Sequence, residues 1–180
     1  MRIGLIRHFP VAEPLPAGWK TAAELAEWRQ RYDLANTLIG QADLGTGVWD
    51  RCLASDLPRA EATARAIFSG SIELTDLLRE PEFAPFRTGR LRLPVWLWRW
   101  VLMLTWLTGH RSQRACRDDF RRRVQAAADC LCALNGDTLV VSHAGMMAYL
   151  SAELRRRGFS GQKLRVAEHA KLYIYEKTQS

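Results

Sequence analysis

Two histidines and two arginines stand where predicted strands end and predicted helices begin. His8 follows Arg7 at the end of a short apolar run near the N-terminus, and His143 comes directly after Thr138–Ser142, the strongest buried-strand pattern in the chain. Arg59 lies in the first turn of a predicted helix, where free backbone N–H groups and the helix dipole favour an anion. Two imidazoles and two guanidiniums that meet at one edge of a sheet would form a pocket for a dianionic phosphoryl group.

This set of side chains permits phosphoryl transfer through a covalent intermediate. A histidine nucleophile must be neutral, and with a reference pKa of about 6.5 most imidazole is already neutral at pH 7. Nearby arginines disfavour its protonation further. Transfer to His8 would give a phosphohistidine, and a carboxylic acid would protonate the leaving oxygen. Glu80 and Glu82, which follow a third predicted strand, are both candidates for that acid.

The elements that must position these residues alternate between strands and helices. The predicted strands are Arg2–Arg7, Val48–Ser55, Ser71–Thr75, Thr138–Ser142 and Ala170–Lys177. The predicted helices are Thr21–Leu34, Leu57–Phe68, Ser112–Leu134 and Met146–Arg157. This alternation predicts an α/β sandwich around a mostly parallel sheet, in which sites form where the carboxyl ends of strands meet helix N-termini.

Local signals add detail to three of these helices. Thr21 and Glu24 form a capping box, and Asp56 is expected to cap the helix that begins at Leu57. The inner face of the helix over Ser112–Leu134 is expected to contain Ala115, Val124, Ala127, Ala128 and Leu131.

Length and net charge indicate how many domains the chain forms and which partners it is expected to have. The 180 residues predict one domain over residues 1–180, and 26 basic against 19 acidic residues give a formal charge of +7. Residues 87–123 contain ten Arg and two Asp, so this basic insert accounts for the whole excess. No nucleic-acid recognition motif accompanies it, so no nucleic-acid partner is expected. The four cysteines lack zinc-ligand spacing and no secretory signal opens the chain, so we expect a cytoplasmic protein without a metal.

The insert contains a Trp-rich segment, Leu93–Thr108, that holds four of the seven tryptophans with Arg99 near its middle. A membrane-spanning helix needs about 20 apolar residues, and this run is shorter and charged. A buried helix, a hydrophobic lid over a pocket, an interfacial helix and a dimer contact all remain open, and the first two are favoured.

Four sequence blocks, in family order, resemble the histidine phosphatase (phosphoglycerate-mutase-like) superfamily. They are Leu5–His8, Ala54–Ala64, Leu78–Glu80 and Val140–Gly145. The block Ala54–Ala64 is the most specific of the four.

The resemblance implies a three-layer αβα sandwich and phosphoryl transfer without metal or other cofactor. It implies that His8 is the phosphate-accepting nucleophile and that Arg7, Arg59 and His143 bind the transferring phosphate, with His143 also counted as catalytic. Glu80 occupies the family's usual proton-donor position, and Glu82 is close enough in sequence to be the alternative.

Several positions around the phosphate residues depart from the family pattern. Phe9 replaces the usual Gly after the nucleophile, and Val11 and Pro14 replace the common Thr and Asn of the following loop. The stretch Phe83–Arg87 replaces a frequent Phe-Gly-x-Trp-Glu-Gly sequence. These departures lie around the substrate rather than at the phosphate, so they bear on the substrate more than on the reaction class.

The leading hypothesis is therefore a metal-independent phosphatase that hydrolyses a phosphomonoester through a phosphohistidine on His8. The expected substrate is a phosphorylated small molecule or a phosphoprotein, and the options include a protein phosphohistidine and an intermediate of the alpha-ribazole branch. A phosphoglycerate mutase is the alternative within the superfamily. A catalytically weak anion- or membrane-binding module is the alternative from another class, with the Trp-rich segment as a homodimer or peripheral membrane contact.

Overall fold

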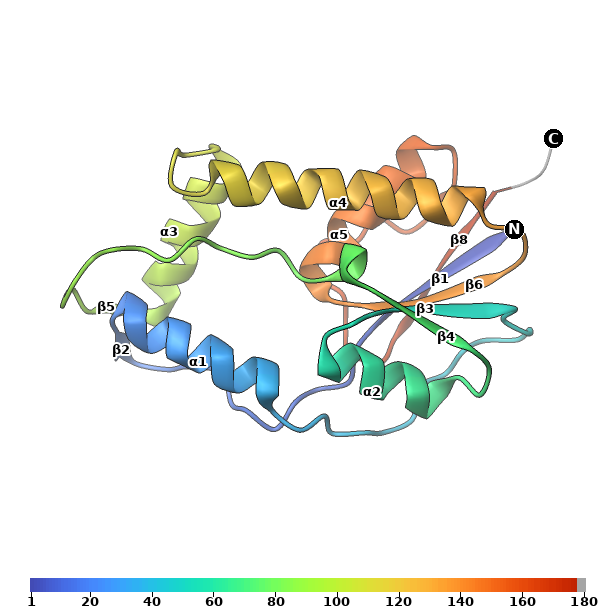
Figure 1. Ribbon diagram of the computed structural model, residues 1–180, viewed down its shortest axis with the longest axis horizontal. Helices are drawn as coiled ribbons and strands as arrows, with labels where there is room; N and C mark the ends of the chain where they lie inside the picture. The colour runs from blue at the N-terminus through green and yellow to red at the C-terminus, as the bar shows by residue number, and fades with distance from the viewer. Residues whose placement is uncertain (178–180) are drawn as a thin grey trace.

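A six-stranded sheet in the order β4-β3-β6-β1-β8-β7 forms the centre of the protein in the computed structural model, which describes residues 1–177 (Figure 1). Its strands are β1 (Arg2–Arg7), β3 (Arg51–Ser55), β4 (Ile72–Thr75), β6 (Thr138–Ser142), β7 (Ser160–Gly161) and β8 (Leu172–Glu176). Strands β4, β3, β6 and β1 pair in parallel, whereas β8 runs antiparallel to β1. The predicted mostly parallel sheet is confirmed.

Helices cover both faces of this sheet, which gives the three-layer αβα sandwich. The helices are α1 (Ala22–Leu34), α2 (Pro58–Ile67), the short 3-10 helix η1 (Asp76–Leu78), α3 (Val95–Leu107), α4 (Arg114–Ala133) and α5 (Ala144–Arg156). Alternate strand residues face opposite layers: Leu5 and Val140 pack with α4 and α5, whereas Ile6 and Val141 pack with α2. Figure 1 shows α4 and α5 on one side of the sheet and α2 on the other.

The start of α2 differs from the sequence-based prediction. The structure confirms the capping box of α1, in which the Thr21 hydroxyl accepts from the backbone N–H of Glu24 at 3.1 Å. Asp56 was the predicted cap of α2, and this prediction is wrong: α2 begins at Pro58 without a side-chain cap. The Asp56 carboxylate instead accepts two hydrogen bonds from Arg79, at 2.7 and 2.5 Å, and a charge-assisted pair of this kind outcompetes a single capping bond.

The buried face of α4 also differs in part. Val124, Ala127, Ala128 and Leu131 are buried as predicted, but Ala115 is exposed. Figure 1 shows the reason, because the first turns of α4 extend past the edge of the sheet and have no strand beneath them.

Three predicted strands begin later than expected, β4 by one residue, at Ile72 rather than Ser71, and β3 and β8 by more. β3 begins at Arg51 rather than Val48, because the indole of Trp49 turns into the core and packs over Gly4. β8 begins at Leu172 rather than Ala170, which has a φ of 57° and therefore cannot continue an extended strand.

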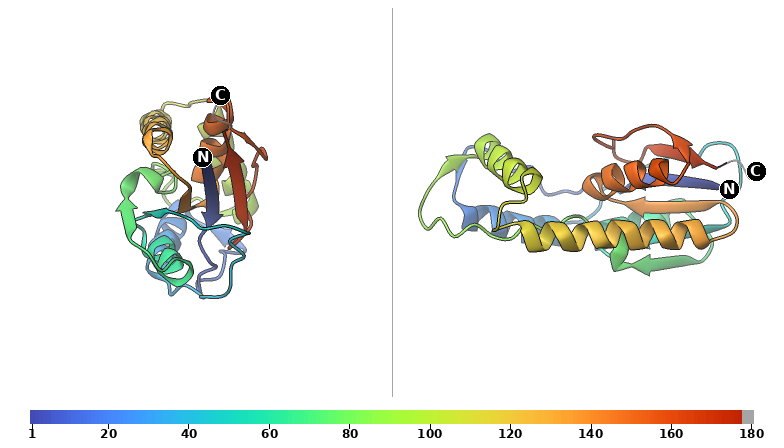
Figure 2. Two further views of the ribbon diagram at one scale, coloured as in Figure 1. Left: turned by 90° about the vertical axis from the view of Figure 1, so that its right-hand side faces the viewer. Right: turned by 90° about the horizontal axis from the view of Figure 1, so that it is seen from above.

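A second group of elements lies beyond the carboxyl ends of the parallel strands (Figures 1 and 2). Strands β2 (Trp19–Lys20) and β5 (Leu93–Pro94) pair antiparallel and, together with α1 and α3, form what we call the distal lobe. The Trp-rich segment therefore folds as β5 and α3. Of the α3 side chains only Trp98 and Trp106 are buried, so the buried helix, one of the two favoured alternatives for this segment, is wrong. Within residues 1–177 no helix is both long enough and apolar enough to cross a membrane.

Candidate active site

The strand register brings His8 and His143 to the same edge of the sheet. Arg7 of β1 lies opposite Ser142 of β6, so the next residue of each strand leaves the sheet at the same point. The backbone N–H of His8 donates to the Ser142 carbonyl at 3.0 Å, which continues the ladder by one bond. The two imidazole centroids are 5.1 Å apart, and both rings are buried. The structure thus brings together the two histidines that the sequence placed after separate strands.

The surroundings of His8 set its tautomer and its charge. Its Nδ1 lies 2.6 Å from the Phe9 carbonyl oxygen. Because a carbonyl oxygen only accepts, Nδ1 carries the proton and Nε2 keeps its lone pair. Burial and, to a smaller extent, the charges of Arg59 and Arg7 lower the pKa of His8 to about 3, against a raising effect of the Phe9 bond. His8 is therefore neutral at neutral pH, as a nitrogen nucleophile must be.

Two arginines present buried N–H groups without partners beside this ring. Nη1 of Arg59 donates to Asp33 Oδ1 at 2.7 Å, and the guanidinium lies 5.1 Å from the centroid of the Tyr32 ring. Nε and Nη2 of Arg59, and Nε of Arg7, are buried and have no hydrogen-bond partner within the described chain. A buried polar group without a partner costs about 1–3 kcal/mol. An anion with several acceptor oxygens would satisfy these donors.

His143 contributes a further buried nitrogen at the N-terminus of α5. It is the N-cap residue of that helix, and its Nε2 lies 2.9 Å from the Ser55 hydroxyl oxygen. Its Nδ1 is buried and unpartnered among residues 1–177. Burial, followed by the charge of Arg59, lowers the pKa of His143 well below its usual value. Nδ1 faces a carboxylate oxygen of Glu80 at 3.8 Å, which places the predicted acid next to the phosphate residues.

The two candidate acids have different surroundings. Glu80 Oε1 accepts the backbone N–H of Gly145 at 2.8 Å, which leaves Oε2 to carry a proton toward the pocket. Burial raises the pKa of Glu80 above its usual range, in opposition to the Gly145 bond and the nearby arginines. Glu82 is exposed and has no hydrogen bond or ion pair within the described part of the chain. Of the two, the structure brings only Glu80 to the histidines.

Gly145 is required for this position of Glu80, which gives a first prediction. A Cβ at residue 145 would collide with Glu80 Oε1 and would lie 2.9 Å from Pro81 Cδ. Gly145→Ala should therefore displace the Glu80 carboxylate. If Glu80 is the general acid predicted from the sequence, kcat for an alkyl phosphate should then fall by about 10²-fold with an unchanged circular dichroism spectrum. Ala148→Gly, one turn further along α5, is the control for altering a small residue in that helix. Full activity of Gly145→Ala would show that Glu80 does not need this position.

The structure also places three residues in the site that the sequence analysis did not identify. The His169 ring lies 5.2 Å from that of His8, and its Nδ1 lies 2.6 Å from the His8 carbonyl oxygen. Because β8 is antiparallel to β1, it is the residues before β8 that reach the catalytic edge, and a rule based on the carboxyl ends of strands omits them. Arg29 and Asp33 of α1 form an ion pair at 3.1 Å beside Arg59. In the sequence their spacing of four residues is that of an ordinary solvated helix pair.

Comparison with known proteins identifies the family of this fold. A model of the histidine phosphatase superfamily (branch 1) matches residues 16–179, a range that begins after His8. No curated protein has a sequence that matches the chain.

Several solved structures share the fold at low sequence identity. The alpha-ribazole phosphatase from Shigella flexneri has a TM-score of 0.54 at 21% identity, with 95% of this chain and 98% of the other covered. A mycobacterial glucosyl-3-phosphoglycerate phosphatase has a TM-score of 0.52 at 17% identity, with 86% and 79% covered. The family match extends over most of the chain, and the chain therefore belongs to the histidine phosphatase superfamily.

Proposed function

We propose that this protein hydrolyses a phosphomonoester through a phosphohistidine formed on Nε2 of His8. One observation carries the proposal: a neutral, buried imidazole with a free Nε2 lies among buried N–H groups of Arg59 and Arg7 that have no partner within residues 1–177. A phosphoryl group has the charge and the acceptor oxygens to satisfy those donors while its phosphorus faces Nε2.

The first step transfers the phosphoryl group to the enzyme. The lone pair of His8 Nε2 forms a bond to phosphorus as the bond from phosphorus to the ester oxygen breaks. Protonated Glu80 gives its proton to that oxygen, so the product leaves as an alcohol. The guanidiniums of Arg7 and Arg59 and Nδ1 of His143, as a donor, stabilise the charge on the other phosphoryl oxygens.

The second step returns the enzyme to its starting state. Glu80, now ionised, takes a proton from a water molecule as that water attacks phosphorus. The bond between phosphorus and Nε2 breaks, inorganic phosphate leaves, and the lone pair returns to His8. The raised pKa of Glu80 suits a group that must give a proton and take it back in the same cycle.

The direct test is hydrolysis of p-nitrophenyl phosphate in the presence of a chelator, with release of inorganic phosphate as the readout. A panel of phosphorylated metabolites should accompany it, including alpha-ribazole phosphate and glucosyl-3-phosphoglycerate, the substrates named for two structural neighbours. Phosphatase activity that persists in the chelator supports the proposal. Interconversion of 2- and 3-phosphoglycerate without release of phosphate would replace it with a mutase.

The role of Glu80 predicts a dependence on the leaving group. Nitrophenolate leaves readily without a proton, whereas an alkoxide does not. Glu80→Gln should therefore lower kcat for an alkyl phosphate by about 10²–10⁴-fold and change kcat for p-nitrophenyl phosphate far less. Glu82→Gln is the matched control and should leave kcat unchanged for both substrates.

The same pair of variants predicts a pH dependence. Because only protonated Glu80 can donate, kcat/KM for the alkyl phosphate should fall as pH rises through the raised pKa of Glu80. The second ionisation of the substrate, at about pH 6, affects wild type and Glu80→Gln alike. The difference between the two profiles therefore isolates Glu80, and parallel profiles would exclude it as the acid.

A further inference from the structure

Helix α3 carries an apolar face that no other element covers within the described residues. Its members, which we call the α3 apolar face, are Trp96, Trp100, Met103, Leu104 and Leu107. Their spacing puts them on one side of a helix with 3.6 residues per turn. At the two ends of this face, Trp96 is 63% exposed and Leu107 is 61% exposed. Contiguous exposed apolar surface of this kind marks an interaction site.

Buried contacts on the other side of α3 hold the helix in place and determine where this face points. Trp98 is buried and donates from Nε1 to the Lys20 carbonyl at 2.8 Å, and its ring stacks on Phe86. Trp106 is buried and donates from Nε1 to the Tyr149 hydroxyl at 2.9 Å. The helix is therefore held to the distal lobe and to α5, and the α3 apolar face points outward as part of a fixed surface.

The segments around this face carry positive charge alone. From Phe83 to Arg117 the sequence has seven arginines and no Asp or Glu. Arg90, Arg99 and Arg111 are exposed and have no carboxylate within 4.0 Å among residues 1–177. The acidic residues of the distal lobe lie on α1 instead. The positive charge of the surface next to the α3 apolar face thus favours a negatively charged partner.

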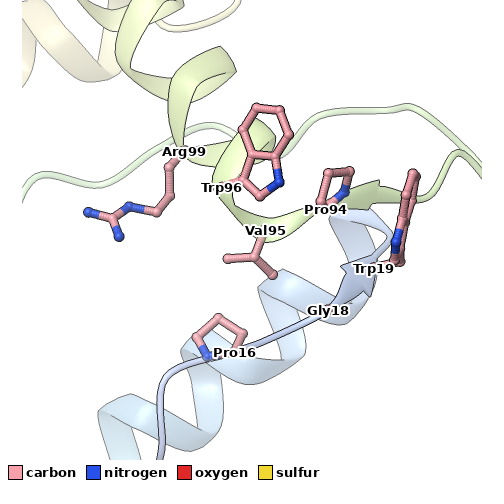
Figure 3. Close-up of a pocket in the computed structure, with 7 residues that line it drawn as sticks. All are labelled: Pro16, Gly18, Trp19, Pro94, Val95, Trp96 and Arg99. Atoms are coloured by element: carbon pink, nitrogen blue, oxygen red, sulfur yellow. The ribbon is translucent and has the colours of Figure 1, made fainter.

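A hollow at the start of α3 is lined by both apolar and positively charged side chains (Figure 3). Its volume is about 430 Å³. Its lining residues are Pro16, Gly18, Trp19, Pro94, Val95, Trp96 and Arg99. The hollow contains none of the candidate catalytic residues, and its lining includes two tryptophans and one arginine, with Trp19 and Arg99 at opposite ends (Figure 3). Tryptophan and arginine are the side chains found where a protein meets lipid headgroups.

We infer that the α3 apolar face docks the protein on a membrane that contains anionic phospholipids. The leucines and Met103 would enter the boundary between headgroups and acyl chains, Trp96 and Trp100 would lie at headgroup level, and Arg99 would reach lipid phosphates. At 13 residues, α3 is about 20 Å long, so it lies in the interface rather than crossing the membrane.

The same charge disfavours a second copy of this chain as the occupant. A two-fold contact through the α3 apolar face would bring two sets of exposed arginines, with Arg99 of each copy among them, to one interface without added carboxylates from α3. Like charges brought together at an interface disfavour association, whereas an anionic bilayer offers the opposite charge.

Docking would also orient the molecule. Figure 1 places α3 beyond the carboxyl ends of the parallel strands, the end of the sheet that carries His8 and His143. A protein attached through α3 would hold this end toward the lipid surface. The docking itself does not depend on the proposed phosphatase reaction, so the two can be tested separately.

The experiment is co-sedimentation of the full chain with vesicles of pure phosphatidylcholine and with vesicles of equal parts phosphatidylcholine and phosphatidylglycerol. We expect binding to the mixed vesicles, with a shift of tryptophan emission to shorter wavelength. Raising the salt from about 0.1 M to about 1 M shortens the Debye length from about 10 Å to about 3 Å and should weaken this binding. Circular dichroism of each variant checks that it is folded.

Two variants and two matched controls test the residues. The double variant Trp96→Ser, Trp100→Ser should lower the partition coefficient at least about tenfold, whereas Val48→Ser, Val166→Ser, which alters two exposed apolar residues elsewhere, should not. Arg99→Glu should lower the coefficient about tenfold, and Arg155→Glu on α5, with the same change in charge, should lower it less.

Three results would overturn the inference. The first is no binding to the mixed vesicles. The second is equal binding to both vesicle types with no effect of Arg99→Glu. The third is a dimer in size-exclusion chromatography that Trp96→Ser, Trp100→Ser converts to a monomer, because the face would then be covered by a second copy.

Discussion

His8→Asn is expected to lower kcat/KM for p-nitrophenyl phosphate by about 10⁴-fold or more, because it removes the atom that accepts the phosphoryl group in the proposed reaction. The ring of His8 is buried, its Nδ1 bonds to the Phe9 carbonyl and leaves Nε2 free, and the nearby Arg59 has N–H groups without a partner in the described chain. The measurement is steady-state release of nitrophenol at equal concentrations of folded protein.

Two controls accompany this variant. His110→Asn makes the same chemical change at an exposed histidine outside the site and should be fully active. His169→Asn alters the ring beside His8, which bonds to the His8 backbone and does not accept phosphate in the proposed reaction, so it should retain far more activity than His8→Asn. If His8→Asn and His169→Asn lost the same activity, the assignment of the nucleophile would be open again.

Arg59→Lys is expected to lower kcat/KM by about 10²–10³-fold even though it keeps the positive charge. The guanidinium of Arg59 has an N–H group bonded to Asp33 and further N–H groups that are buried without a partner in the described chain. A lysine ammonium is a single point donor and cannot bond to Asp33 and present a planar fork to phosphate at once. Arg59→Ala should lose at least as much.

The measurements on Arg59→Lys should separate a loss of phosphate binding from a loss of folding stability. Competitive inhibition by inorganic phosphate should weaken in parallel with the loss of kcat/KM, while the midpoint of urea unfolding changes little, because Asp33 is about one-third exposed and can be solvated. Arg155→Lys on the surface of α5 is the control and should change neither quantity. An Arg59→Lys protein with unaltered inhibition by phosphate would show that Arg59 does not hold the phosphoryl group.

Much of the fold follows from local signals in the sequence. Thr138–Ser142 has the apolar run Leu139–Val141 at its centre and forms β6 with the predicted bounds, because a strand buried on both faces needs no alternation. The parallel arrangement of β1, β3 and β6 then places His8, Ser55 and His143 at one edge. For these residues, the order of strands and helices was sufficient to predict that they meet.

The remaining features depend on long-range contacts that no local pattern encodes. Asp56 has the residue type of a helix cap, but it pairs with Arg79, 23 positions away in the sequence. His169 lies in the site because β8 is antiparallel to β1, and the direction of a strand cannot be predicted from the residues of that strand. The exposure of Ala115 reflects how far α4 projects beyond the sheet. Each difference arises where tertiary contacts override a correct local preference.

The position of Glu80 rather than Glu82 in the site also depends on a long-range contact. Both follow β4 within a few residues, and the sequence offers no reason to prefer one by charge or type. In the structure Gly145, 65 positions away in the chain, holds Glu80 in place: its backbone N–H bonds to the Glu80 carboxylate, and its lack of a side chain leaves room for that carboxylate.

The covalent intermediate on His8 is the central feature of the proposed reaction, and acid-free rapid quenching tests it most directly. Wild-type protein mixed with a phosphomonoester and denatured within a turnover should carry one phosphoryl group, located on His8 by peptide mass spectrometry. That modification should be stable in alkali and lost in acid, as a bond from phosphorus to an imidazole nitrogen is. His8→Asn should carry none. An active wild-type protein that never carries the group, or carries it on another residue, would contradict phosphoryl transfer to His8.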